Sequence, residues 1–470
     1  MAENAVLSPY ALATFIMKNA LLILGIALAS GTALLAQTPA SSAWKAGAAS
    51  AVITPKTLMW MAGYASRTKP AEGSDTDLFA KALVLQDAAG GKLAIITADL
   101  VSVPRSVRLA TAAAVGKAHG IPPERLLINV SHTHCGPEMR TWRTYASDDP
   151  ARRTREAEEY GVYLAETFTR LVGEALDKRV EASTSYVHSR CGFAMNRRRP
   201  KASGGFSNDP NPDGPVDHRV PVLRVQSIHE KRDLALVFGY ACHCTTMGHQ
   251  KFNGDYAGYA QAFIQQAHPG TVALFMNGCS GDQNPYPRRK LEYAEAHGRS
   301  LALAVEAALD TPPRTLQGGI RAALREIPLK FERTPTRPEL EERAKGSDKL
   351  DVQLAKHLLG QLDAGETLMT EYPYPVQVVR LGDELTLVAL GGEVVVDYSL
   401  RLQKEIADPV VWVAGYSNDV MTYIPSRRVW NEGGYEGGDA MKYNHFPARW
   451  HPEVEDVIIR AVHELRDGLK

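Results

Sequence analysis

The segment of residues 131–137, which reads Ser-His-Thr-His-Cys-Gly-Pro, carries the side chains with the most specific chemistry in this chain. It follows the apolar run Leu126–Val130, which predicts a buried strand. Residues two apart on a strand point to the same face, so His132 and His134 can enter one pocket at the strand's carboxyl end. Two imidazoles can begin a metal site, although a transition metal needs further ligands. A strand-end histidine is also often only a hydrogen-bonded polar residue, so the pair alone leaves both interpretations open.

Other apolar runs also end in polar residues. They are residues 93–96 before Asp99, 234–239 before His243, 272–276 before 277–282, 385–390 before Glu393, and 411–414 before 417–419. Continuous apolar runs predict strands that are covered on both faces. Helical patterns alternate with these runs, at residues 103–117, 156–176, 256–266, 289–309, 394–406 and 452–469. The alternation predicts an α/β fold, with a mixed or mainly parallel sheet covered by helices. Ligands bind beyond the carboxyl ends of strands in such sheets, so a metal site is expected there.

The polar residues at these strand ends form a possible set of metal ligands. Zinc accepts imidazole and carboxylate ligands, and a catalytic zinc keeps one position for water. Each residue also has an ordinary alternative, since Glu393 could cap the helix that follows it and Tyr423 could be a core residue. The strand ends supply His132, His134, His243 and Glu393, and the segment after the last strand supplies Tyr423 and Tyr435.

Composition limits the class of protein. With 470 residues, 44% of them hydrophobic, the chain can bury one large core or two moderate ones. Lys+Arg and Asp+Glu both number 53, and no basic stripe stands out, which argues against a nucleic-acid partner and favours a small or neutral one. The five cysteines leave at least one thiol without an intramolecular partner. Cys242 and Cys244 could bind a metal or could be small buried residues beside a site.

The amino terminus predicts export. Lys18 precedes the apolar residues 21–29, and small residues follow up to Ala36, so residues 1–36 are expected to form a signal peptide with Met17 as an alternative start. A membrane anchor is the alternative, but the apolar stretch is short. We therefore expect a secreted or periplasmic protein in which residues 37–470 form a single catalytic domain. Two segments are expected to be insertions: residues 197–219, a long loop that borders the pocket, and residues 338–366, a charged pair of helices.

Several motifs occur together in an order that resembles one known family. They are residues 46–55, 61–65, 96–100, 131–134, 196–197, His243 with 245–247, 281–282, 392–393, 417–418, and Tyr423 with Tyr435. In these motifs the chain resembles, almost from end to end, the amino-terminal catalytic domain of the neutral, non-lysosomal ceramidases. The resemblance implies a hydrolase of N-acyl lipids that depends on Zn2+.

The resemblance also implies roles for individual residues. His134 would carry a proton to the leaving amine, while Arg197 and Tyr435 would donate hydrogen bonds to the carbonyl oxygen or to substrate hydroxyls. Asp99 could orient a ligand or could be a buried structural carboxylate. The zinc ligands implied are His132, His243, Glu393 and Tyr423.

The chain departs from the family in two respects. Ceramidases carry Gly-Asp-x-Ser-Pro, with a catalytic serine, where this chain has Asn284 in the sequence Gly-Asp-Gln-Asn-Pro. An amide cannot be a covalent nucleophile, although it can still hold a substrate carbonyl or head group by hydrogen bonds. Either water activated by the metal attacks the amide or Ser280 replaces the serine, and we expect the first because a zinc site supplies its own nucleophile. The family's carboxyl-terminal immunoglobulin-like domain is also not expected here, so substrate presentation or membrane docking could differ.

The leading hypothesis is therefore an exported zinc-dependent enzyme that cleaves the amide bond of a ceramide-like lipid by metal-activated water. A zinc-dependent esterase or lactonase on the same scaffold is one alternative. A catalytically inactive surface-binding protein is another. The expected partner is a small lipid amide, with no nucleic acid and with room for peripheral membrane contact. Acyl length and head group depend on the shape of the pocket.

Overall fold

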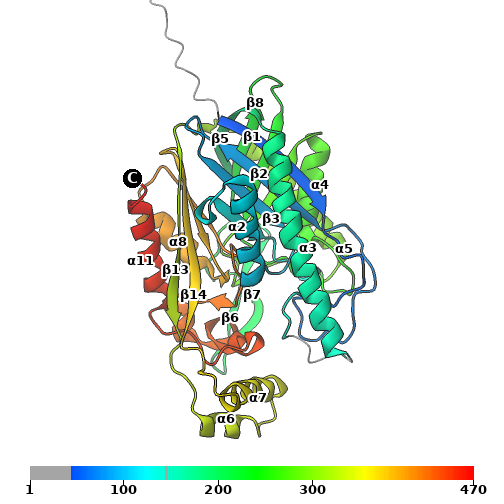
Figure 1. Cartoon of the computed structure of the whole chain (residues 1–470), viewed down its shortest axis with the longest axis vertical. Helices are drawn as coiled ribbons and strands as arrows, with labels where there is room; N and C mark the ends of the chain where they lie inside the picture. The colour runs from blue at the N-terminus through cyan, green and yellow to red at the C-terminus, as the bar shows by residue number, and fades with distance from the viewer. Residues whose placement is uncertain (1–43, 143–146, 148) are drawn as a thin grey trace, which may run out of the picture. The chain divides into compact units, whose positions relative to one another are not determined.

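The computed structural model describes residues 44–142, 147 and 149–470, and Figure 1 shows two large sheets with helices against them. The expected signal peptide, residues 1–36, lies outside the described residues. Within the part of the chain that is described, no helix has both the length and the apolar character needed to cross a membrane.

The first sheet has nine strands in the order β10-β9-β8-β5-β1-β2-β3-β4, with β12 paired to β5. The β3–β4 and β9–β10 pairs are parallel, and the other pairs are antiparallel. The sheet is therefore mixed, which confirms one of the two predicted forms. Its strands are β1 Trp44–Val52, β2 Phe79–Gln86, β3 Lys92–Ala98, β4 Leu126–Val130, β5 Val180–Arg190, β8 Arg219–Ser227, β9 Asp233–Tyr240, β10 Val272–Asn277 and β12 Arg314–Thr315.

The second sheet has four strands in the order β13-β14-β15-β17. They are β13 Ile320–Lys330, β14 Glu371–Leu381, β15 Leu385–Leu390 and β17 Val410–Ala414. Two small sheets lie outside these large ones. The first contains β11 Gln283–Pro285, β6 Ala194–Pro200 and β7 Phe206–Asn211, and the second contains β16 Glu393–Val394 and β18 Tyr423–Ile424.

The two large sheets pack face to face, and helices cover their outer faces (Figure 1). In β2, Ala82 and Val84 pack in the cluster that includes the helices, whereas Leu83 and Leu85 pack toward the second sheet. This period-two alternation between two apolar layers explains why the strands read as continuous apolar runs. The covering helices are α2 Arg105–His119 and α3 Pro150–Asp177, α4 Asp255–Ala267 and α5 Leu291–Leu309, and, on the second sheet, α8 Val396–Glu405 and α11 Val454–Asp467.

Of the two segments predicted to be insertions, one has the predicted structure and the other does not. The predicted charged pair of helices at residues 338–366 is confirmed as α6 Arg337–Arg343 and α7 Lys349–Asp363. The prediction of a loop at residues 197–219 is wrong, because this segment continues β6, forms β7 and begins β8. The β6–β7 hairpin is almost entirely polar, so a search for apolar runs does not detect it. The remaining short elements are η1 Pro123–Arg125, α9 Arg427–Glu432, α10 Gly434–Gly437 and η2 Asp439–Asn444.

Candidate metal centre and active site

The amide of Asn129 joins three strand ends around the site. The backbone N–H of Asn277, at the end of β10, donates to Asn129 Oδ1 at 2.8 Å, and Asn129 Nδ2 donates to the carbonyl of Gly415, just after β17, at 2.8 Å. Asn129 is buried in β4, at the opposite edge of the first sheet from β10. The residues that follow these strands therefore converge at one place. Asn129 was not predicted from the sequence, where its only signal is a polar residue inside an apolar run.

Backbone carbonyls fix the rings of two buried histidines. His132 follows β4 in a left-handed conformation with φ of 63°, and its Nδ1 lies 2.6 Å from the carbonyl oxygen of Val101. His243 follows β9, and its Nδ1 lies 2.6 Å from the carbonyl oxygen of Ser280. Because a carbonyl oxygen can only accept, each Nδ1 carries the hydrogen in these bonds. In this tautomer Nε2 presents its lone pair, and this is the orientation that a metal-binding histidine requires.

Glu393 and Tyr423 face these two nitrogens from the other half of the chain. They lie side by side because β16 and β18 pair in register, Glu393 opposite Tyr423. Glu393 Oε2 is 3.2 Å from His132 Nε2 and 3.3 Å from His243 Nε2, and the Tyr423 hydroxyl is 3.3 Å from His243 Nε2. The four residues predicted as ligands thus form one cluster of donor atoms.

The spacing and protonation of this cluster suit a divalent cation. Ligands held 2.0–2.1 Å from a tetrahedral zinc are about 3.3–3.4 Å apart, close to the spacing of the described donor atoms. Burial, followed by the charge of Arg197, lowers the pKa of His243 to about 3, so this imidazole stays in the neutral form that binds metals. Burial raises the pKa of Tyr423 well above its ordinary value, while Arg197 acts in the opposite direction, as a bound cation would.

A glycine explains the tight packing of Glu393. Gly281 packs so closely against the next segment that a Cβ atom there would lie 2.6 Å from the carbonyl oxygen of Glu393. The neighbouring Asp282 accepts a hydrogen bond at 2.9 Å from the backbone N–H of Val396, at the start of α8. The pair Gly281 and Asp282 therefore positions the segment that carries Glu393.

His134 lies against the cluster but is held differently. Its Nε2 is 3.1 Å from His132 Nε2, and its buried Nδ1 meets no hydrogen-bond partner among the described residues. Burial, followed by His132 and His243, lowers the pKa of His134 well below its ordinary value. The potential donor nitrogens of His132, His134 and His243 all lie within 4.8 Å of one another, and this group could hold a metal ion.

Residues of the 61–67 segment fix the position of His134. Gly63 has a φ of +93°, and a Cβ atom on it would lie 2.5 Å from Cγ of His134. Arg67 Nη2 donates to the carbonyl oxygen of His134 at 2.7 Å. These contacts give a physical reason for the Met-Ala-Gly-Tyr-Ala motif, which had no predicted role of its own.

Arg197 extends from β6 into the site, and three neighbours fix its buried guanidinium. Its Nη2 donates to the Tyr423 hydroxyl at 3.0 Å, its Nε to Glu436 Oε1 at 2.8 Å, and its Nη1 to Asn284 Oδ1 at 3.3 Å. Glu436 is buried in α10 and also accepts from Arg198 Nη1 at 2.6 Å. Glu436 was not predicted, because it lies in a glycine-rich segment without a recognisable pattern.

Asn284 supports Arg197 within the protein. Its Oδ1 also accepts from the Thr245 hydroxyl at 3.1 Å, and its Nδ2 donates to Asn208 Oδ1 at 3.1 Å. Both ends of this amide are therefore occupied by protein groups. Asn208 lies on β7, in the segment for which a loop was predicted, and no sequence signal pointed to it. Ser280, the other possible replacement for the family serine, is completely buried.

Tyr435 lies at the mouth of the site. It is 41% exposed, its ring is 5.1 Å from that of Tyr423, and it lines the pocket above His132, His134 and Glu393. The structure therefore brings Arg197 and His134 against the predicted ligands, places Tyr435 at the opening, and sets Asn284 behind Arg197.

Asp99 and the cysteines have structural positions. Asp99 accepts from the Phe79 backbone N–H at 3.0 Å and from Gln261 Nε2 at 3.1 Å, which matches the alternative of a buried structural carboxylate. All five thiols are free and buried. Burial raises the pKa values of Cys242 and Cys244 well above the ordinary thiol value, which fits small buried residues better than metal ligands.

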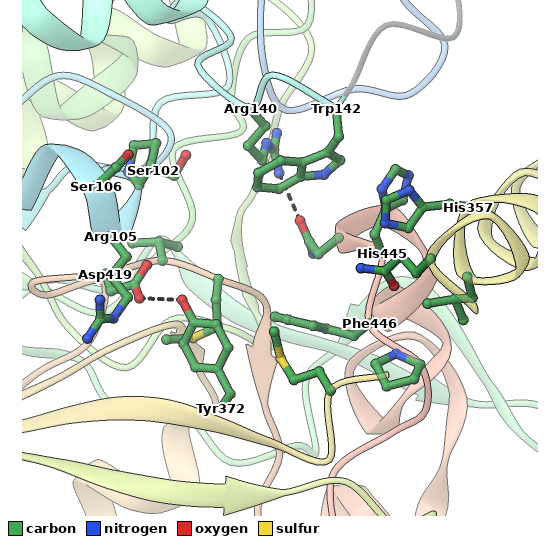
Figure 2. A pocket seen from close by; sticks show the side chains of 18 residues that line it. Ser102, Arg105, Ser106, Arg140, Trp142, His357, Tyr372, Asp419, His445 and Phe446 are labelled. Atoms are coloured by element: carbon green, nitrogen blue, oxygen red, sulfur yellow. Dashed lines mark hydrogen bonds between the residues drawn. The ribbon is translucent and has the colours of Figure 1, made fainter. Parts of the chain in front are cut away.

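A larger cavity adjoins the pocket over His132, His134 and Glu393. Figure 2 shows the side chains that line this larger cavity. It has a volume of about 410 Å³, within the range of small-molecule sites. Apolar side chains contribute much of its wall, among them Leu358, Met369, Val420, Met421 and Phe446. The two cavities share Ser102, Arg140, Val420, Met421 and Asn444.

Comparison with known proteins agrees with this architecture. The family model described as neutral/alkaline non-lysosomal ceramidase, N-terminal, matches residues 44–288. The crystal structure of a neutral ceramidase from Pseudomonas aeruginosa superposes with a TM-score of 0.69 at 18% identity, over 90% of this chain and 74% of that chain. A ceramidase complexed with C2 has the same TM-score and identity, over 91% of this chain and 76% of that chain. At this identity the likeness establishes the fold. No curated protein matches the sequence.

Proposed function

Because the chain belongs to the neutral/alkaline non-lysosomal ceramidase family, we propose that it is an exported, zinc-dependent hydrolase that cleaves the amide bond of an N-acyl lipid. The family and the fold are those of ceramide-hydrolysing enzymes. One similar structure is that of a ceramidase complexed with C2, and we extend a lipid amide substrate to this chain. The adjoining cavity with its apolar wall residues supports a substrate with a hydrocarbon part.

The observation that carries the proposal is the inward orientation of four donor groups. Each imidazole of His132 and His243 is held through Nδ1, so its Nε2 lone pair points toward Glu393 at 3.2–3.3 Å. The hydroxyl of Tyr423 also lies 3.3 Å from Nε2 of His243. Two imidazoles, a carboxylate and a phenol are hard or borderline ligands that zinc accepts. When bound here, zinc would lower the pKa of a water molecule to about 7 and polarise the amide carbonyl.

The chain's own residues would move protons and stabilise charge. His134 borders the donor cluster, and among the described residues its Nδ1 meets no backbone carbonyl that would fix its tautomer, unlike Nδ1 of His132 and His243. It can therefore take up the proton that the attacking water loses and pass it to the leaving amine. Arg197, held by Glu436 and Asn284, is fixed next to Tyr423 and would donate to the carbonyl oxygen as negative charge develops. Tyr435 at the mouth would donate to the same oxygen or to a substrate hydroxyl.

The test of this function is the hydrolysis of a panel of lipid amides with and without a metal chelator. We expect a free fatty acid and an amine to form, and we expect the chelator to stop their formation. Matched esters and lactones test the esterase alternative, which the Asn284 difference keeps open. A pure protein that holds no stoichiometric zinc and hydrolyses nothing would instead be the inactive surface-binding protein.

The identity of the nucleophile can be tested at Ser280. Its side chain is completely buried, and its backbone carbonyl accepts a hydrogen bond from Nδ1 of His243. We therefore expect Ser280→Ala to keep most of the activity, and we expect no acyl adduct when the reaction is quenched and the intact protein is weighed. An adduct on Ser280, or nearly complete loss of activity in this variant, would show that the serine nucleophile has moved four residues along the chain.

Export is part of the proposal and rests on the sequence of residues 1–36. Its test is the amino-terminal sequence of the protein recovered from the secreted or periplasmic fraction. A mature protein that begins close to residue 37 is the expected result. Retention of the full amino terminus in the cytoplasmic fraction would contradict it.

A further inference from the structure

The 410 Å³ cavity leads away from the metal site and ends against an insertion. At one end it shares wall residues with the pocket over the histidines, among them Ser102, Val420 and Met421. At the other end its wall is formed by His357, Leu358 and Gln361 of α7, none of which lines the pocket over the histidines. Figure 2 shows His357 on its helix across the cavity from Ser102 and Arg105. The cavity therefore spans the distance between the reacting centre and α7.

The wall that α7 provides is fixed to the site. Lys442, in η2, pairs with Asp348 at 2.7 Å and with Asp351 at 3.6 Å, at the start of α7. The His357 ring packs on His445 with ring centroids 4.2 Å apart, just after η2. Since η2 also supplies residues to the pocket over the histidines, α7 and the reacting centre are held by a common element.

The hairpin of α6 and α7 has a small apolar core of its own. Leu358 belongs to it and also lines the cavity, so one side of this core forms the end of the cavity. The members of the core are Leu340, Leu354, Ala355, Leu358 and Leu368. A wall supported by packed side chains cannot retreat without cost, because a well-packed core resists changes in volume.

We infer that this cavity takes one unbranched alkyl chain of the substrate and that α7 sets the maximum length of that chain. The inference rests on the proposed function, because it takes the scissile amide to lie at the histidines. The alkyl chain could belong to the acyl part or to the amine part of an N-acyl lipid. Both have the same chemistry, a saturated hydrocarbon that replaces water along Val420, Met421 and Phe446.

The test uses two series of amides, one lengthened in the acyl part and one in the amine part. In the series whose chain enters the cavity, kcat/KM of the wild type is expected to rise roughly fourfold for each added methylene group, because each buried methylene contributes about 0.8 kcal/mol. The rise should stop when the chain reaches α7. We call the chain length at which kcat/KM stops rising the break. The series that shows a break identifies the part of the substrate that the cavity holds.

Variants at Gln361 should move the break. Gln361 is half-buried, so changes there should leave the fold intact, and thermal unfolding and zinc content would verify this. Gln361→Trp fills the end of the cavity and should move the break to shorter chains, whereas Gln361→Ala should move it to longer chains. Lys356→Trp, an exposed position of α7 that does not line the cavity, is the matched control and should leave the break in place.

The results separate this inference from the proposed function. If the amides are hydrolysed but the break lies at the same chain length in the wild type and in both Gln361 variants, the role of α7 is overturned and the proposed function is left intact. If no amide is hydrolysed by the zinc-loaded protein, the function fails, and calorimetric binding of fatty acids and alkylamines of each length then tests the cavity directly. A length limit on binding that Gln361→Trp shortens would support the role of α7, and equal limits in both proteins would overturn it.

Discussion

The histidines around the donor cluster differ in how their rings are held, and this difference predicts different consequences of removing them. His243 is fixed through Nδ1, so His243→Ala should lose zinc and activity together. His134 has no such bond to any residue that the structure describes, so His134→Ala should keep zinc and lose on the order of a hundred-fold or more in kcat, the usual scale for an acid or base. Metal analysis and steady-state kinetics on both variants provide the check. Loss of zinc from His134→Ala with full zinc in His132→Ala would show that the wrong histidine of the pair was chosen as ligand.

The contact between Gly63 and His134 leads to a second prediction at this scale. A methyl group on Gly63 would lie 2.5 Å from the imidazole, and the φ of +93° is unfavourable for any other residue. Gly63→Ala should therefore displace His134 and lower kcat at least tenfold while zinc content stays near that of the wild type. Gly192→Ala is the matched control, because a Cβ there meets nothing within 4 Å. Unchanged turnover in Gly63→Ala would contradict a positioning role for this close approach.

Some residues of the site could be predicted from the sequence, and the residues that support them could not. His132, His134, His243 and Glu393 carry their chemistry in their residue type and follow apolar runs, so the strand-end rule locates them. Tyr423 lies farther from an apolar run, and the choice of the four ligands came from the resemblance to the family. Glu436 and Asn208 act only through Arg197 and Asn284. They come from a glycine-rich segment and a polar hairpin, and no local pattern distinguishes such supporting residues from surface ones.

At the scale of elements, the same rule accounts for some of the strands that were predicted. Strands β4 and β15 are buried along their whole length and were predicted with their observed bounds. Strands β5 and β13 mix buried, half-buried and exposed positions and have no long apolar run, so they were missed. The second sheet was missed with them as a separate layer, because face-to-face packing of sheets depends on contacts between residues far apart in the chain.

Asp282 connects two elements and predicts a dependence of stability on pH. Burial, followed by the charge of Asp397, raises the pKa of Asp282 to about 7. A carboxyl group with a raised pKa in the folded state contributes stability below its unfolded pKa, and this contribution is lost as pH rises through the folded value. The free energy of unfolding should thus lose on the order of 4 kcal/mol from this group between about pH 4 and about pH 7.

The check is urea unfolding of the wild type and of Asp282→Asn across this pH range. The amide is neutral throughout, so the variant should lack this part of the decline. The variant should also be less stable than the wild type by an amount that does not change with pH. One of the two Asp282 oxygens that accept from Asn196 Nδ2 and from the Val396 N–H is replaced by an NH2 group, which can only donate. Parallel curves for the two proteins would contradict the raised pKa.

At the scale of the whole molecule, the donor cluster joins the two halves of the chain. His132 and His243 follow strands of the first sheet, within the residues that the family model matches, whereas Glu393 and Tyr423 lie beyond them and follow strands of the second sheet. A metal held by all four would therefore connect the sheets at the point where Asn129 already bonds to Gly415. Because an unfolded chain cannot hold these groups together, metal binding should stabilise the folded state.

The prediction is that a chelator lowers the melting temperature of the wild-type protein. At a free zinc concentration a thousand times the Kd, the metal contributes about 4 kcal/mol to the free energy of unfolding, which corresponds to a shift of several degrees. Differential scanning calorimetry with and without the chelator measures it. His243→Ala is the control, because without one of the four donors its melting temperature should lie near that of the chelated wild type and should respond little to the chelator. If the chelator changes neither protein, or shifts both equally, the cation does not link the two halves, and Asn129 with the apolar layer between the sheets suffices to hold them together.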